Sequence, residues 1–138
     1  MDDKEQVIRH LEMIQGVINR LSHNSFLIKG WSVTILSAGI IFIVRSEIQN
    51  GWFILAFIVL IIGSWSLDGY FLWQERLLRG VYNNVRKRES TDFSMDTKEQ
   101  KSRPGKKMLK VMFRYSLVLF YLMQLAFVLA VFILLNKI

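Results

Sequence analysis

The 138-residue chain is apolar and basic, with 52% hydrophobic residues and a formal net charge of +7. Its apolar residues are gathered in long runs, whereas a soluble core needs them spread with the period of a helix or a strand. Because the sequence contains no cysteine, it excludes disulfides, thiolate catalysis and sulfur metal sites. The composition therefore indicates a single membrane domain over residues 1–138.

The chain begins with an amphipathic segment that leads into a first apolar run. Within residues 4–22, apolar side chains recur at alternating steps of four and three, which is the pattern of an amphipathic helix with a packing partner. These side chains are Val7, Leu11, Ile14, Ile18 and Leu21. Residues 26–44 are long enough to cross a hydrocarbon layer of about 30 Å at about 1.5 Å per residue. We expect a cytoplasmic surface helix and then the first transmembrane helix.

Two further spans flank a basic loop. Residues 51–73 form a strong second apolar run, and residues 74–88 continue it without proline, which predicts a cytoplasmic extension of the same helix. Residues 89–108 mix serine, threonine, aspartate and lysine with the only proline of the chain, which predicts a loop. Residues 109–135 are apolar again. The predicted fold class is an all-α membrane protein with three transmembrane helices.

The basic residues predict how the chain is oriented. Twelve of the 18 lysines and arginines lie between Arg76 and Arg114, whereas the loop joining the first two spans has only Arg45. Short loops rich in lysine and arginine stay on the cytoplasmic side. We therefore expect the amino terminus and the large loop in the cytoplasm and the carboxyl terminus outside.

Lys29 and Asp68 are ionisable groups inside predicted spans, where such groups cost free energy and usually face a partner or water. If the first two spans fold as a hairpin about Ile48, the two residues lie at nearly the same depth. The sequence therefore predicts that an ion pair between them is available. The pair either locks the hairpin or gates a polar path through the membrane.

Small and polar residues also recur within the spans. The proposed polar stripe consists of Gly30, Thr34 and Ser37 on the first span, Ser64 on the second and Gln124 on the third. Such stripes usually allow helices to pack closely in a bilayer. In a homo-oligomer the same stripe could line a channel.

A group of basic residues lies near the predicted membrane boundary, where lysine and arginine attract anionic lipid headgroups. It comprises Arg86, Lys87, Arg88, Lys101, Arg103, Lys106, Lys107, Lys110 and Arg114. Because arginine and lysine suit phosphates, a phosphate-bearing signal is an alternative ligand. The charge adjoins apolar runs, which favours lipid and membrane orientation over nucleic acid.

No pattern supports enzymatic or metal chemistry. Asp92 and Asp96 stand without histidine or further carboxylates at ligand spacing. His10 and His23 are isolated from any nucleophile or glycine-rich phosphate loop. We expect no metal, no cofactor and no enzymatic activity.

The segments SFLIKGWSVTILSA, LDGYFLWQERLLRGVYNNVR and DFSMD resemble a family of small predicted bacterial membrane proteins. In architecture the chain also resembles the compact transmembrane effectors of bacterial anti-phage systems. That resemblance implies the bacterial cytoplasmic membrane and a partner or signal that triggers membrane damage. The chain lacks the appended ligand-binding domain of the better-known effectors.

Three spans cannot enclose much of a channel, so a pore requires several subunits. We therefore expect a homo-oligomeric pore-forming or membrane-disrupting effector, with the amphipathic cytoplasmic helices joining the subunits and a sensor protein as a candidate partner. One alternative is a non-conducting subunit that docks a cytoplasmic protein. Another is a phage holin.

Overall fold

The computed structural model describes residues 2–46, 52–103 and 107–135. Within these ranges the chain forms helices and no strand: α1 (Asp3–Ser46), α2 (Trp52–Val85), α3 (Lys98–Lys101), α4 (Met108–Met112) and α5 (Tyr115–Leu135). The three long helices, α1, α2 and α5, are long and apolar enough to cross a membrane. The protein is an all-α membrane protein, as the sequence predicts.

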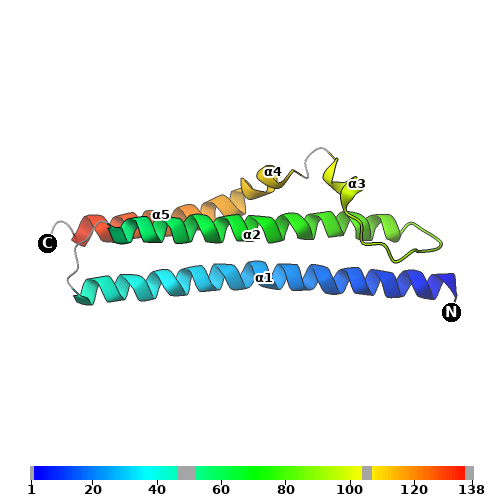
Figure 1. Ribbon diagram of the computed structural model, residues 1–138, viewed down its shortest axis with the longest axis horizontal. Coiled ribbons are helices and arrows are strands. Elements are labelled where there is room, and N and C mark those ends of the chain that lie inside the picture. The colour runs from blue at the N-terminus through cyan, green and yellow to red at the C-terminus, as the bar shows by residue number, and fades with distance from the viewer. Residues whose placement is uncertain (1, 47–51, 104–106, 136–138) are drawn as a thin grey trace.

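The long helices form an elongated bundle (Figure 1). α1 and α2 run antiparallel and lie side by side over almost their whole length, while α5 lies along the half of α2 that begins at Trp52. The start of α1 and the end of α5 are at opposite ends of the molecule. α2 therefore holds the central position, because every other helix packs against it.

α1 is much longer than a bilayer is thick. Its 44 residues correspond to about 66 Å, roughly twice the hydrocarbon thickness of about 30 Å. The expected surface helix (4–22) and first span (26–44) are therefore parts of one continuous helix, joined through residues 23–25. The part of the α1–α2 hairpin that lies beyond α5, residues 3–22 and 75–85, is called the stalk below.

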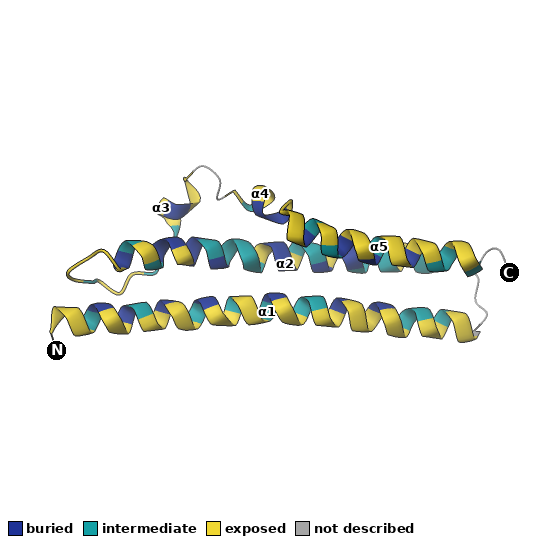
Figure 2. Cartoon of the chain, turned by 180° about the vertical axis from the view of Figure 1, so that it is seen from behind, coloured by how far each residue is buried: buried dark blue, intermediate teal, exposed yellow. Residues whose placement is uncertain are grey.

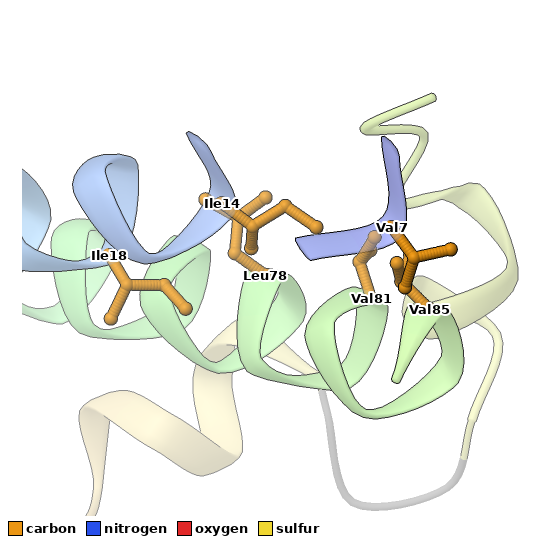
Figure 3. Close-up of a cluster of buried hydrophobic side chains, with 6 residues drawn as sticks. All are labelled: Val7, Ile14, Ile18, Leu78, Val81 and Val85. Atoms are coloured by element: carbon orange, nitrogen blue, oxygen red, sulfur yellow. The ribbon is translucent and has the colours of Figure 1, made fainter. Parts of the chain in front are cut away.

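The stalk is held together by an apolar seam between its two helices (Figure 3). Val7, Ile14 and Ile18 of α1 face Leu78, Val81 and Val85 of α2, and all six are buried. The amphipathic face that the sequence predicts is thus covered within the chain itself.

The chain turns back at the end of the stalk. α2 ends at Val85, three residues before the predicted end of the extension, and the amide of Lys87 donates to the carbonyl of Asn84 at 3.2 Å, which tightens the last turn. The loop then folds onto α1, where buried His10 lies 2.6 Å from the hydroxyl of Thr91 (Nδ1 to Oγ1). The backbone amide of Ser94 donates to Asp92 and lowers the pKa of that carboxyl.

The predicted third span (109–135) is divided into α4 and α5. Between them lie Phe113 and Arg114, which are outside both helices. The carbonyl of Met112 accepts a hydrogen bond from the indole of Trp65 at 3.1 Å. Because that carbonyl points to α2, the helix is interrupted there and restarts at Tyr115.

The membrane half has a thin core and an apolar surface (Figure 2). Its buried cluster consists of Leu36 of α1, Ile61 of α2 and three residues of α5, namely Leu117, Tyr121 and Val128. Exposed residues cover the outer faces, and they include bulky side chains such as Phe42, Val59 and Phe127. Such faces suit contact with lipid.

Ile14→Ala should destabilise the stalk by about 2–5 kcal/mol, because it removes a fully buried side chain and leaves a cavity. Ile8→Ala is the matched control, since Ile8 is 57% exposed, and it should change stability by less than about 0.5 kcal/mol. Hydrogen exchange of the stalk amides in mild detergent measures both. If the two variants changed stability equally, the apolar seam would not be what holds the two helices of the stalk together.

Candidate functional site

An ion pair lies between α1 and α2 in the membrane half of the bundle. The amine of Lys29 pairs with the carboxylate of Asp68, whose side chain is fully buried, while 29% of the Lys29 side chain is exposed. The structure thus brings together the two residues that the hairpin argument placed at one depth. A charge without a partner at this position would be strongly unfavourable.

Two hydroxyl groups complete the shell of Asp68. Ser25 of α1 donates to one carboxylate oxygen, and Tyr121 of α5 donates to the other at 3.1 Å. The amine of Lys29 also donates to Ser25 at 3.0 Å. The negative charge is therefore stabilised by donors from both neighbouring helices, and it ties all three long helices together.

A second polar contact lies farther along α1. The amide nitrogen of Gln124 donates to the hydroxyl of Ser32 at 2.9 Å, and that hydroxyl donates to the carbonyl of Lys29 at 2.9 Å. The amide oxygen of Gln124 is buried and has no hydrogen-bond partner among the described residues. An unsatisfied acceptor in this setting is costly, so it is a position at which water or another donor would be favoured.

A third contact closes the network toward the stalk. The hydroxyl of Ser22 donates to Glu75 at 2.8 Å, and the guanidinium of Arg79 pairs with the same carboxylate at 2.8 Å. Acidic residues of α2 thus meet hydroxyl groups of α1 at two successive levels. Together these contacts make a polar column between helices whose outer faces are apolar.

The polar column continues the heptad seam of the stalk. Leu11, Ile18, Ser25 and Ser32 are spaced by seven residues, so they lie along one side of α1. The first two are apolar and pack in the stalk, whereas the two serines face Asp68 and Gln124. Sequence reasoning missed both serines, although continuing the heptad register past Leu21 would have identified them.

The five residues of the proposed polar stripe do not lie together. Ser64 and Gln124 are buried inside the bundle, whereas Gly30, Thr34 and Ser37 are exposed on the outer face of α1. The hydroxyl of Thr34 donates to the carbonyl of Gly30 at 3.0 Å. Ser32 occupies the side of α1 that faces the interior of the bundle. Gly30, Thr34 and Ser37 lie on the other side of the helix and therefore point away from α2.

The proposed lipid- or phosphate-contacting residues fall into separate groups. Arg86, Lys87 and Arg88 follow α2 at the tip of the stalk, whereas Lys107, Lys110 and Arg114 lie in or beside α4. Lys101 lies over the ring of Trp73 at 5.5 Å from its centre, and Arg103 pairs with Glu99 at 2.8 Å. Lys106 lies outside the described residues. The group that faces the membrane half is therefore the one around α4.

Asp68→Ala should lower the stability of the bundle by about 3–5 kcal/mol, because it leaves the Lys29 charge without its partner. The double variant Lys29→Met/Asp68→Leu should recover most of that loss, since apolar residues of similar volume can replace a buried ion pair. Apparent melting temperatures in mild detergent measure both. If the double variant is as unstable as the single one, the pair is not the dominant contact.

Comparisons with known proteins supply no relative from which a role could be transferred. No protein-family model, curated protein or solved structure matches the chain.

Proposed function

We propose that this protein is a homo-oligomeric pore-forming or membrane-disrupting effector of the bacterial cytoplasmic membrane, acting in anti-phage defence. The observation that carries the proposal is the Lys29–Asp68 pair, which lies with its hydroxyl shell between the three long helices. Each charged residue in a span costs about 2.5–3.5 kcal/mol. A simple membrane anchor needs no such residue, whereas a gate does.

The arrangement corresponds to a closed gate. Asp68 is fully buried, and its oxygens are occupied by Lys29, Ser25 and Tyr121. A water path along the polar column requires α1 to move away from α2 and α5. Such a movement would expose both charges and the amide of Gln124 to the same path, where they would stabilise water and ions.

Association of subunits through the membrane half is the arrangement that the exposed residues favour. Gly30, Thr34 and Ser37 face outward on α1, and small or hydroxyl-bearing residues on a lipid-facing surface allow close helix packing. The apolar faces of the stalk are already covered by each other. We therefore place the contact between subunits on α1 within the bilayer.

A non-conducting subunit that docks a cytoplasmic protein is the second candidate. The stalk favours it, because about 22 residues of α1 extend beyond the length needed to cross the bilayer. In this alternative the Lys29–Asp68 pair only locks the hairpin. The two functions differ in what they predict for a variant that keeps the bundle but removes both charges.

Expression of the wild-type protein, with its neighbouring genes and phage challenge, should depolarise bacterial cells and reduce viable counts. Lys29→Met/Asp68→Leu should not depolarise them, because its bundle stays packed but offers no charge to a water path. A potential-sensitive dye at matched membrane levels of protein measures the difference. Glu99→Ala is the control for charge loss, since Glu99 is exposed and distant from the pair, and it should act like the wild type.

Two other outcomes of the depolarisation experiment would contradict the proposal. If the charge-free double variant depolarises cells as the wild type does, the pair is only structural and the gate assignment is wrong. If the wild type causes no depolarisation under these conditions, the docking subunit becomes the better account.

Gly30→Leu should convert the oligomer in mild detergent to smaller species, because a bulky side chain would separate α1 from its neighbour in the next subunit. Gly63→Leu on α2 is the matched control. A Cβ atom at either glycine would meet nothing within 4 Å, so neither substitution should disturb the single chain. Light scattering of the purified protein measures the mass. A monomeric wild-type protein would exclude the oligomer.

A further inference from the structure

Two buried carboxylates lie on the same side of α2. Asp68 and Glu75 are seven residues apart, which places them about 10 Å from each other along the helix axis. Each accepts a hydrogen bond from a serine of α1, Asp68 from Ser25 and Glu75 from Ser22. The charge of Glu75 is paired with Arg79 of its own helix. Glu75 therefore adds a second acidic group to the polar column without adding an ion pair between helices.

Buried polar groups continue the line from Glu75 through Asp68, away from the stalk. The hydroxyl of Tyr121 donates to Asp68 at 3.1 Å. Gln124 follows Tyr121 by three residues, so it lies on the same side of α5. Its amide nitrogen donates to the hydroxyl of Ser32 at 2.9 Å. The polar column thus reaches from the stalk to Gln124, near the middle of α5.

The amide oxygen of Gln124 is the last polar atom of this line. It is buried, and no group in the described ranges donates a hydrogen bond to it. Ser32 cannot do so, because its single hydroxyl proton is given to the carbonyl of Lys29 at 2.9 Å. A buried acceptor of this kind is stabilised by a donor such as water or a hydronium ion. The position therefore favours a small donor that comes from outside the chain.

The polar column is narrow, and the bundle beyond it is apolar. Contacts across the column are direct, with donor and acceptor 2.8–3.1 Å apart. Beyond Gln124, Leu36, Ile61 and Val128 join the three long helices in an apolar cluster. A hydrated metal ion crosses such a level only through a wide opening, whereas a proton needs a single file of water molecules. Acidic residues inside spans also commonly form proton relays. The arrangement therefore favours the proton.

We propose that the ion carried by the polar column is the proton, and that Asp68 and Glu75 relay it. The inference rests on the proposed function, because it names the ion that passes when α1 moves away from α2 and α5. A hydronium ion hydrogen-bonded to the amide oxygen of Gln124 gives one proton to Asp68. One O–H bond of the hydronium ion breaks, an O–H bond forms on the carboxylate, and a neutral water molecule remains.

The second transfer restores Asp68. Its carboxyl group loses the proton through water to Glu75, where a new O–H bond forms, and Glu75 releases the proton to water at the stalk. Both carboxylates end as they began, so one proton has moved along the column and no other reactant is consumed. In the closed arrangement the amine of Lys29 occupies the Asp68 carboxylate. Proton transfer therefore begins only when α1 moves.

The test uses the cells of the depolarisation experiment, with the neighbouring genes and phage challenge, in mildly acidic medium. A ratiometric pH-sensitive fluorescent protein reports the cytoplasmic pH, and flame photometry of the collected cells reports their K⁺ content. In cells with the wild-type protein, the cytoplasmic pH should fall toward that of the medium before K⁺ is lost.

Glu75→Gln and Gln124→Leu should each slow the initial acidification at least about tenfold, because each removes a group that accepts the proton or positions its carrier. Gln124→Leu should not lower the apparent melting temperature in mild detergent, since it removes an unsatisfied buried acceptor. A slower proton flux in that variant is therefore not a loss of folding.

Glu99→Gln is the matched control for Glu75→Gln. Glu99 pairs with Arg103 four residues later at 2.8 Å, as Glu75 pairs with Arg79, but Glu99 is exposed and lies outside the column. This variant should acidify the cytoplasm at the wild-type rate.

Three results would overturn the relay. Depolarisation with loss of K⁺ and without acidification would leave the pore in place and exclude the proton as its ion. An unchanged rate of acidification in Glu75→Gln or in Gln124→Leu would remove that residue, and with it the relay. A wild-type protein that neither depolarises nor acidifies the cells would refute the proposed function itself.

Discussion

The charge of Asp68 is the constraint on which the arrangement of the long helices depends. A carboxylate buried among apolar helices is stable only where several donors reach it. Lys29 and Ser25 reach it from α1, and Tyr121 reaches it from α5. Rotating α1 by one residue, about 100°, would turn both of its donors away. The ion pair thus sets the rotation of α1 and the position of α5, and the remaining contacts follow.

The α1–α2 hairpin is held by different forces in its two halves. In the stalk, water drives Ile14, Ile18 and Leu78 together through the hydrophobic effect. In a bilayer the lipid tails are as apolar as leucine, so apolar packing gives little preference for a partner helix. There the same side of α1 carries Ser25 and Ser32, which hold α2 and α5 through hydrogen bonds. One heptad register serves both surroundings because the residue type changes where the helix enters the membrane.

α2 makes two different kinds of contact with its neighbours. Toward α1 and α5 it carries Asp68, whose charge is compensated within the chain by Lys29, Ser25 and Tyr121. Toward α4 it carries Gly69, where a Cβ atom would come within 2.6 Å of Cγ of Met112. Close approach on that side therefore depends on the absence of a side chain, whereas on the other side it depends on a balanced charge.

Hydropathy and length alone determined the three apolar runs, the basic loop and the equal depth of Lys29 and Asp68, because a hairpin of regular helices converts residue number into depth. Only the tertiary structure decided which residues face which helix. Thr34 and Ser37 point outward while Ser25 and Ser32 point inward, since rotation depends on the partner and not on the local sequence. The break between Met112 and Tyr115 has the same kind of cause, because the indole of Trp65, 47 residues earlier, takes a carbonyl that a continuous helix would use.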